Sequence, residues 1–390
     1  MQLAFACYKY FPFGGLQRDM LRIALECQKR GHAIRVYTFS WQGEVPEGFE
    51  IVVVPRRGIT SQGKNKYFTQ WLFSHLDENP ADLLVGFNKM PGLDVYYAAD
   101  GCYEARVTDL YGRLYRLGSR YRHFAAYEKA VFGSASDTEI LMISDVQKPV
   151  FQSFYKTPER RLHMLPPGIS RDRCAPVNAA EIRSKFRHEF NIADDEYLLL
   201  MVGSGFKTKG LDRSLKAIKS LPDELKRKVH LFVLGQDKLD TFKLMSKSLG
   251  VDKNLTFFKG RDDVPRFLQG ADLLIHPAYH ENTGTVLLEA VVAGLPVLVS
   301  GICGYAHYVA EAEAGLVLQK PFQQNEFEQQ LLNMLLSDDK PKWRANGLVF
   351  AERADIYSMP VHAADLIEKN YSDNIPETPG TRITVDVNGK

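Results

Sequence analysis

Short apolar runs alternate with amphipathic stretches along almost the whole chain, and this alternation restricts the fold more than any other feature. The first apolar run, residues 3–7, precedes a stretch at 16–30 whose apolar residues recur at helical spacing. A helix is also predicted at 66–76, and further apolar runs predict strands at 33–39, 49–55, 81–87 and 95–99. Such alternation predicts a mostly parallel sheet with helices on both of its faces.

A second alternating series begins after the breaker Pro166-Pro167-Gly168. Because 390 residues are more than one core usually organises, we expect two Rossmann-like α/β domains, at 1–168 and 169–353. Late helices are predicted at 322–336 and 354–368, and residues 371–390 are expected to form a flexible tail. The strands predicted in the second series are 197–202, 230–234, 255–258, 272–277 and 295–299.

The composition excludes several classes of protein. A formal net charge of +2 provides no global basic field, so nucleic acid is not an expected partner. No apolar run approaches the roughly 20 residues that cross a bilayer, and the N-terminal residues lack the basic region of a secretion signal. The five cysteines show no C-x-x-C spacing, which is typical of a reducing compartment. We therefore expect a cytoplasmic protein without structural zinc or disulfides.

Ligands of open α/β sheets bind beyond the carboxyl ends of the strands, so the loops there are candidate sites. Gly14 and Gly15, between the first strand and the first helix, would let a phosphate approach the helix start, although the pair could equally be a tight turn. The glycine-rich loop 203–210 contains Lys209 and is placed for a diphosphate, unless its lysines serve only solubility. Neither loop carries the G-x-G-x-x-G or P-loop pattern, which argues against an NAD enzyme and a Mg-nucleotide hydrolase.

The strongest local signal is residues 276–290, where strand, loop and helix follow in order. Asn282 or Thr283 is predicted to cap the helix. Glu289, about a turn and a half into the helix, is predicted to accept hydrogen bonds from ribose hydroxyls, and Glu281 to lie on the sugar side of the phosphates. The alternative is that both acids merely favour the helix dipole. In the functional interpretation, the capped helix start is an anion site, where the amides of Gly284, Thr285 and Val286 point outward.

Glu281 and Glu289 are separated by seven residues and followed by Ala293-Gly294-Leu295-Pro296-Val297. In this the chain resembles the E-x7-E retaining glycosyltransferases of GT-B fold, specifically glycosyltransferase family 4. The Gly14-Gly15 loop and Lys209-Gly210 match other donor-site elements of that family in order and spacing. Three stretches resemble the lipopolysaccharide core glucosyltransferases of Gram-negative bacteria, and they are residues 8–19, 86–95 and 303–308. The resemblance covers nearly the whole chain except the tail.

The resemblance implies both an architecture and a reaction. The GT-B fold implies an acceptor-binding domain at 1–168, a nucleotide-sugar-binding domain at 169–353, an interdomain cleft, and a C-terminal helix at 354–370 that crosses back to the N-terminal domain. The implied reaction moves α-glucose from UDP-glucose to an inner-core heptose of lipopolysaccharide, with retention of configuration.

One position departs from the family pattern. Many members carry an Arg directly after the glycine that ends the strand, where this chain has Ser204. Neutralisation of the diphosphate therefore falls to other cations, and the candidates are Lys209, Arg173 and Arg261; the alternative for Arg261 is a solvated loop charge. No DxD motif occurs in the chain, so we expect no metal or other cofactor and activity that is insensitive to EDTA.

Retention of configuration allows two chemical routes. One uses a protein nucleophile and two inversions; in the other, attack is from the same face and the leaving phosphate takes the acceptor's proton. The resemblance favours the second and makes Glu281 a positioner of sugar hydroxyls. Asp100 is a candidate sugar or acceptor contact, and Asp19 a candidate acceptor contact. The open alternatives are another UDP-sugar donor, a GT-B sugar-nucleotide epimerase, and a nucleotide-binding protein without turnover.

Residues 103–132 combine basic charge with a regular apolar stripe. Six Arg and Lys residues stand against three acids, and apolar side chains recur every three or four residues from Tyr103 to Phe124. A basic amphipathic helix is typical of contact with an anionic membrane; the alternative is a core helix with a solvated face, and Gly112 and Gly118 disfavour a helix. A glycolipid acceptor favours the membrane, at the inner face of the inner membrane, with lipid contacts at Arg106, Arg113, Arg116 and Arg120.

Overall fold

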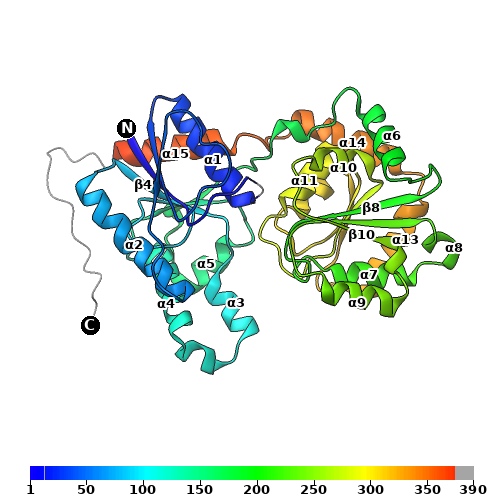
Figure 1. Ribbon diagram of the computed structural model, residues 1–390, viewed down its shortest axis with the longest axis horizontal. Coiled ribbons are helices and arrows are strands. Elements are labelled where there is room, and N and C mark those ends of the chain that lie inside the picture. The colour runs from blue at the N-terminus through cyan, green and yellow to red at the C-terminus, as the bar shows by residue number, and fades with distance from the viewer. Residues whose placement is uncertain (13, 374–390) are drawn as a thin grey trace. The chain divides into compact units, whose positions relative to one another are not determined.

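The computed structural model describes residues 1–12 and 14–373, which form two compact units (Figure 1). Among the described residues, the first unit contains those of Met1–Gly168 and residues 358–373, and the second contains Ile169–Tyr357. The chain thus leaves the first unit directly after the Pro166-Pro167-Gly168 breaker and later returns to it.

In the first unit the described residues form a seven-stranded parallel sheet in the order β3-β2-β1-β4-β5-β6-β7. Side chains alternate between two apolar layers along β1: Leu3 and Phe5 face the core under α1 and α15, while Ala4 and Ala6 face the core under α2 and α4. The strands are β1 (Gln2–Ala6), β2 (Ala33–Thr38), β3 (Phe49–Val53), β4 (Leu83–Gly86), β5 (Val95–Ala98), β6 (Glu139–Met142) and β7 (Leu162–Met164). The helices are α1 (Gly15–Lys29), α2 (Ser61–Glu78), α3 (Tyr103–Leu110), α4 (Ser119–Phe132), α5 (Lys148–Tyr155) and α15 (Met359–Asp373), with short 3-10 turns η1 (Arg113–Leu117) and η2 (Glu159–Arg161).

In the second unit the described sheet has six parallel strands in the order β10-β9-β8-β11-β12-β13. From the central pair, β8 connects outward to β9 and β11 connects outward to β12, so the strand order reverses between β8 and β11. A crevice at such a switch point is where open α/β sheets bind ligands. The strands are β8 (Tyr197–Val202), β9 (Val229–Leu234), β10 (Leu255–Phe258), β11 (Leu273–His276), β12 (Val297–Ser300) and β13 (Gly315–Leu318).

The helices of the second unit cover both faces of its sheet (Figure 1). α11 is mostly apolar because it packs between the sheet and α14; its residues from Leu287 to Val292 are all buried, and Glu289 is the charged one among them. The elements are η3 (Arg171–Arg173), α6 (Ala179–Glu189), α7 (Leu211–Ser220), α8 (Asp223–Lys226), α9 (Asp240–Leu249), η4 (Asp252–Asn254), α10 (Val264–Gly270), α11 (Thr285–Val292), α12 (Ala306–Glu311), α13 (Gln324–Leu336) and α14 (Lys340–Arg353).

The last helices differ from the prediction. The helix expected at 354–370 begins only at Met359, because Ala354 is extended (φ −85°, ψ 138°) and ends α14, a helix that the sequence did not predict. α14 approaches α11 closely at Gly347, where a Cβ would lie 2.4 Å from the carbonyl oxygen of Val291. Residues 371–373 belong to α15 and not to the tail, and 374–390 lie outside the described residues.

The prediction of a C-terminal helix that returns to the N-terminal domain is confirmed, because α15 packs against α1 in the first unit. Its inward side chains are almost completely buried, and they are Met359, Ala363, Ala364 and Ile367.

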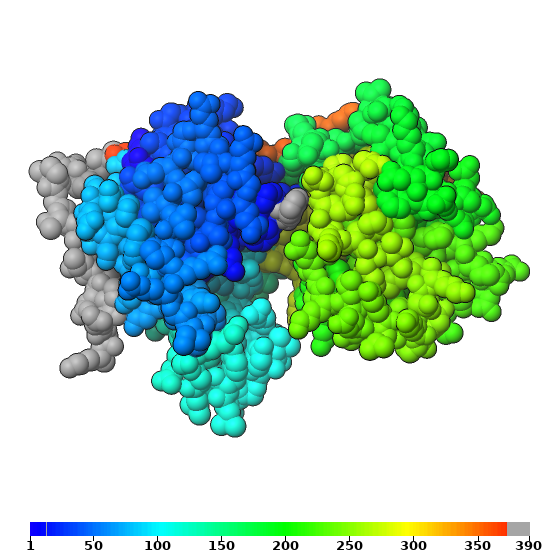
Figure 2. Space-filling model, in the orientation of Figure 1, coloured from blue at the N-terminus to red at the C-terminus, as the bar shows by residue number. Residues whose placement is uncertain are grey.

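The amphipathic helix considered for 103–132 does not run through the segment, and it breaks at the two glycines that disfavoured it. The chain forms α3, η1 and α4, with extended breaks at Gly112 (ψ 166°) and Gly118 (ψ 144°). The apolar stripe divides accordingly: Val107 is buried and the ring of Tyr103 packs against those of Tyr121 and Phe124, whereas the side chains around η1 face solvent. This segment projects from the surface (Figure 2). Its exposed apolar residues are Leu110, Tyr111, Leu114 and Leu117.

Candidate active site

The loops after β8 and β11 touch at the switch point of the second sheet. Three glycines of the β8 loop have positive φ: Gly203 (128°), Gly205 (80°) and Gly210 (79°). Gly210 cannot be replaced without displacing the neighbouring loop, because a Cβ there would lie 2.0 Å from the carbonyl oxygen of Pro277. The Tyr279 amide donates to the Thr208 carbonyl (2.8 Å), which ties the two loops together.

This contact brings Lys209 and Glu281 together. Their side chains form an ion pair and are only 19% and 12% exposed. His276, the last residue of β11, is fully buried, and its Nε2 lies 3.1 Å from Glu281 Oε2. Because a carboxylate can only accept, Nε2 carries the proton and donates it to Glu281. The Glu281 carboxylate is thus held between a cation and a neutral donor.

The protonation states of this cluster are set by burial. Burial lowers the pKa of the Lys209 ammonium to about 8, while the adjacent Glu281 carboxylate favours the charged form, so Lys209 is a cation at neutral pH. Burial, and after it the positive charge of Lys209, lowers the pKa of His276 to about 3. His276 therefore stays neutral over the physiological range of pH while it orients Glu281.

The start of α11 is open to an anion. The predicted cap at Asn282 or Thr283 is wrong: Gly284 occupies the cap position in the left-handed region (φ 85°, ψ 55°), and no side chain caps this helix. A Cβ at Gly284 would lie 3.0 Å from Leu287 Cδ1 and 3.3 Å from Glu281 Cγ, so glycine also leaves room for the Glu281 side chain. The first amides of the helix, those of Thr285 and Val286, point out of its positive end with no side-chain cap over them.

Of the other predicted donor residues of this unit, Glu289 and Arg173 lie together and Arg261 lies apart from them. Glu289 is 5% exposed, and Arg173 Nε lies 3.9 Å from its Oε1, so the Arg173 charge acts on Glu289. Arg261 is not brought to the Lys209–Glu281 pair. It follows the edge strand β10, two strands from β8, and makes a bidentate contact with Asp263 (2.6 and 2.8 Å). Its role in donor binding stays a prediction.

The predicted residues of the first unit lie near the carboxyl edge of their own sheet. Gly14 is the N-cap of α1, and Gly15 has open space where a side chain would lie. Asp100 is exposed after β5. Asp19 accepts from Tyr97 Oη (2.8 Å) and Arg22 Nη2 (2.6 Å), and burial raises its pKa against these two bonds. Asp19 is thus already engaged within its unit, and its contact with an acceptor stays a prediction.

The sequence did not reveal a clamp around the β11 loop. The Arg213 guanidinium donates to the carbonyls of Pro277 (3.0 Å) and Ala278 (2.9 Å). It also lies 3.5 Å from the Tyr279 ring centroid and 3.7 Å from that of Phe322. His276 likewise had no predicted role, although a histidine at the end of an apolar strand could have indicated one. No pattern in the sequence connects Arg213 to the loop that it holds.

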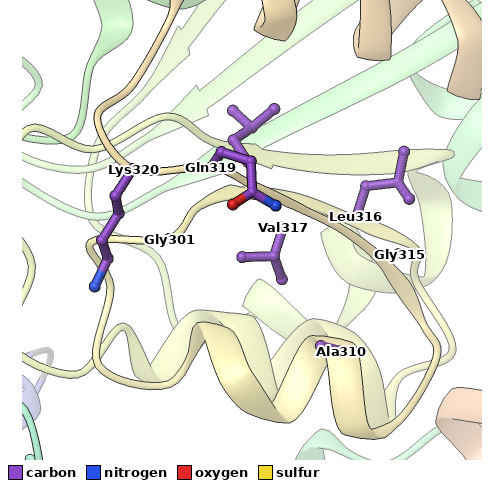
Figure 3. A pocket seen from close by; sticks show the side chains of 8 residues that line it. Gly301, Ala310, Gly315, Leu316, Val317, Gln319 and Lys320 are labelled. Carbon is purple, nitrogen blue, oxygen red and sulfur yellow. The ribbon is translucent and has the colours of Figure 1, made fainter.

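A cavity of about 580 Å³ lies beside the edge strand β13 (Figure 3). Lys320 and Gln319 extend at one end of it, and the remaining lining is backbone and aliphatic side chains. It contains none of the predicted donor residues. Over the described part of the chain, no helix has the length and apolar character to span a bilayer, and no three His, Cys, Asp or Glu side chains are grouped to hold a metal ion.

Comparison with known proteins agrees with this geometry. Residues 182–347 match the family described as glycosyl transferases group 1, and residues 13–173 match glycosyltransferase family 4. The chain is 48% identical over 368 residues to the lipopolysaccharide glucosyltransferase WaaG of Escherichia coli K12, covering 94% of this chain and 98% of WaaG.

Solved structures show the same fold. A crystal structure of WaaG superposes with a TM-score of 0.90, covering 94% of this chain and 99% of the other. Anabaena HepE, solved in complex with UDP-glucose, shares the fold at a TM-score of 0.74 with 16% identity, covering 95% of this chain and 100% of HepE. The chain therefore belongs to glycosyltransferase family 4, with the GT-B fold, and within it to the family of the lipopolysaccharide glucosyltransferase WaaG.

Proposed function

We propose that this glycosyltransferase moves α-glucose from UDP-glucose to an inner-core heptose of lipopolysaccharide, with retention of configuration. The observation that carries the proposal is the buried Lys209–Glu281 pair at the uncapped start of α11, in a chain 48% identical to a lipopolysaccharide glucosyltransferase. The pair supplies a cation for the leaving diphosphate and a carboxylate for the transferred sugar within one contact.

In this proposal the diphosphate and the ribose of the donor are bound by different parts of the α11 region. The diphosphate is held by the Lys209 ammonium and by the amides of Thr285 and Val286. Glu289 accepts from the ribose hydroxyls, and the Arg173 guanidinium places a positive charge beside that carboxylate, with Nε 3.9 Å from Oε1. Fixed donors of this kind stabilise developing charge without reorganisation, which is usually the largest catalytic contribution.

The contacts of Glu281 support its role as a positioner. A carboxylate that already pairs with Lys209 and accepts from His276 is a weaker nucleophile than the same carboxylate without these contacts, because both contacts stabilise its charge. In the same-face route the acceptor hydroxyl attacks the anomeric carbon while the bond to the diphosphate breaks. The leaving phosphate oxygen then takes the hydroxyl proton, and Lys209 stabilises the charge that remains.

A donor and acceptor panel tests the proposal. We expect UDP-glucose to stabilise the protein in a thermal-shift assay, and UDP to be released only when truncated lipopolysaccharide with an exposed heptose is present. The product should carry an α-linked glucose by NMR, and EDTA should leave the rate unchanged. UDP-N-acetylglucosamine as the preferred donor, a β-linked product, or epimerised sugar nucleotide without transfer would each contradict it.

We also propose that the segment around η1 contacts the anionic inner face of the cytoplasmic membrane, where a glycolipid acceptor would be anchored. Four exposed apolar side chains, from Leu110 to Leu117, lie among exposed arginines, a composition that favours the lipid interface. The cations are Arg106, Arg113, Arg116 and Arg120. Co-sedimentation with vesicles of phosphatidylcholine and phosphatidylglycerol at low salt tests the contact, and equal binding to pure phosphatidylcholine vesicles would contradict it.

A further inference from the structure

A second basic surface lies in the first unit, outside the 103–132 segment. Residues 51–76 contain four Lys or Arg residues and no Asp or Glu. All four of these cations are exposed, and they lie in the loop between β3 and α2 and in the first two turns of α2: Arg56, Arg57, Lys64 and Lys66. We call these residues, together with Ile59, the α2 basic loop.

The α2 basic loop has a defined conformation. Thr60 caps α2, since its Oγ1 accepts from the Gly63 amide at 3.1 Å. Gly58 has a φ of 99°, and a Cβ there would lie 3.1 Å from the Gly63 carbonyl carbon and the Lys64 amide nitrogen, so the loop folds tightly onto the helix start. This turn leaves the Ile59 side chain 97% exposed, with two arginines before it and two lysines after it.

The loop adjoins the segment that carries η1. Gln62 Nε2 donates to Ser119 Oγ (3.4 Å), which joins the start of α2 to the start of α4. About two turns further along both helices, Tyr127 Oη donates to Thr69 Oγ1 (3.1 Å), so the two helices stay in contact. Figures 1 and 2 show the beginning of α2 beside the projecting segment. Ile59 and the exposed apolar residues around η1 thus lie on neighbouring parts of one surface.

We propose that the α2 basic loop is a second contact with the anionic membrane surface, in which Ile59 enters the headgroup region and the four cations lie over lipid phosphates. The inference rests on the proposed membrane contact of the η1 segment. It commits to a lipid surface because a fully exposed apolar side chain between cations matches the interface, where charge and apolar insertion act together. Two separated contacts would also fix the orientation of the first unit on the membrane, which one contact cannot do.

The test compares charge-matched variants of the whole protein in vesicle co-sedimentation. Neutralising two cations in Arg56→Gln/Arg57→Gln should weaken binding to phosphatidylglycerol-containing vesicles roughly thirtyfold at low salt, on the basis of ~1 kcal/mol per cation near the surface. The control, Lys216→Gln/Lys219→Gln, removes the same charge from the exposed face of α7 in the other unit and should bind like the wild type. Ile59→Ser should weaken the part of the binding that persists at high salt.

The outcomes separate this inference from the membrane contact on which it rests. If Arg56→Gln/Arg57→Gln binds like the wild type while Arg113→Gln/Arg120→Gln loses binding, the η1 contact stands and the α2 basic loop is excluded. If the wild type does not bind anionic vesicles at all, both proposals fail. Turnover of a water-soluble heptose acceptor by the Arg56→Gln/Arg57→Gln variant should equal that of the wild type. An equal loss of turnover and binding would show that the variant damages the fold and not a lipid contact.

Discussion

The Lys209 ammonium is charged only up to a pH near its pKa of about 8, which burial sets below the ordinary value of 10.5. Because the charged form stabilises the leaving diphosphate, the rate should fall as the pH rises through about 8. Lys209→Met should lower kcat about 10²- to 10³-fold, as loss of one preorganised donor does, and Lys209→Arg should retain activity and lose the alkaline decline. Steady-state UDP release measures both. Lys207→Met, which changes an exposed neighbour, is the control. A Lys209→Met enzyme that keeps its activity would exclude the role of Lys209 in stabilising the diphosphate.

His276 should act through Glu281 without titrating. Its pKa of about 3 keeps it neutral, so it should contribute no acid limb to the rate between pH 5 and 8. His276→Phe leaves Glu281 short of one buried donor, which should lower kcat/KM roughly 10- to 100-fold. His276→Gln can still donate and should recover most of that loss. An acid limb in the wild type that disappears in His276→Gln would mean that the imidazole itself exchanges protons.

The roles of some of these site residues could be predicted from the sequence and those of others could not, for a physical reason. Glu281 and Glu289 lie within one loop and helix, so their spacing alone predicts how they flank the helix start. Arg213 meets its partners only when β8 and β11 pair, because more than sixty residues of chain separate Arg213 from Pro277. His276 and Glu281 are only five residues apart, but their contact depends on the conformation of the loop between them. The Gly284 cap depends on a positive φ that the sequence permits but does not require.

At the scale of elements, the Arg213 clamp connects α7 to the β11 loop and so to Glu281. Arg213→Lys keeps the charge but loses the stacked plane between Tyr279 and Phe322 and the two carbonyl contacts. UDP affinity, measured by calorimetry, should fall about tenfold, since a desolvated cation–π contact contributes up to ~2 kcal/mol. Arg266→Lys, at a partly exposed arginine that pairs with Glu189 and Asp263, is the matched control. Unchanged UDP affinity in Arg213→Lys would show that the loop holds its shape unaided.

The start of α3 is held by a buried carboxylate. Glu128 is fully buried, accepts from the amides of Tyr103 (2.8 Å) and Glu104 (3.0 Å), and pairs with Lys89. Glu128→Leu should destabilise the first unit by about 3–5 kcal/mol, because it leaves the Lys89 charge buried alone. Adding Lys89→Met should recover part of that loss. Chemical denaturation measures the cycle, and additive losses would indicate that the pair is not coupled.

The same segment shows how two sequence signals about one element can conflict. Most strands were predicted within two residues because parallel strands are buried on both faces and read as apolar runs; β8 and β10 match the predicted bounds. The regular stripe from Tyr103 to Phe124 favoured one helix, whereas Gly112 and Gly118 disfavoured it, and the backbone breaks at both glycines. Periodicity reports which residues are apolar, and the glycines decide whether the backbone between them continues as a helix.

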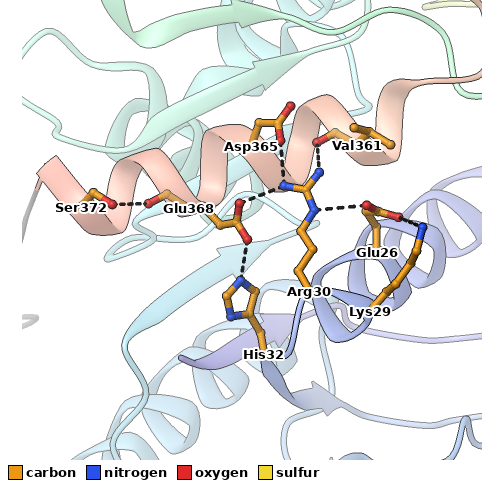
Figure 4. Close-up of polar contacts among 8 residues, drawn as sticks. All are labelled: Glu26, Lys29, Arg30, His32, Val361, Asp365, Glu368 and Ser372. Atoms are coloured by element: carbon orange, nitrogen blue, oxygen red, sulfur yellow. Dashed lines mark hydrogen bonds and ion pairs between the residues drawn. The ribbon is translucent and has the colours of Figure 1, made fainter.

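At the scale of the whole molecule, the chain closes its first unit with its own C-terminal helix. Arg30, just after α1, donates to Asp365 (2.7 Å) and Glu368 (2.9 Å) of α15 and to the Val361 carbonyl (3.2 Å), and Glu368 also contacts His32 Nε2 at 2.7 Å (Figure 4). More than 300 residues separate these partners. The first unit is therefore completed only after the second unit has been made, and α15 couples the two ends of the chain.

This polar cluster should make the stability of the first unit depend on pH. Burial opposes the charge of Glu368, but the hydrogen bonds from His32 and Arg30 lower its pKa below the ordinary 4.5. Its contribution is therefore complete above about pH 4.5 and is lost as the pH falls through the lower folded-state pKa. Since Glu368 is one-third exposed, Glu368→Gln should cost only about 0.5–1 kcal/mol at pH 7, or about 2 °C in the Tm of the first unit. That difference should shrink to nothing in acid, where the wild-type carboxyl is protonated too. The control is Glu352→Gln, which changes an exposed residue of α14 and should leave the Tm unchanged at every pH. If the Tm of Glu368→Gln stays below that of the wild type under pH 4, then packing and not charge holds α15 in place.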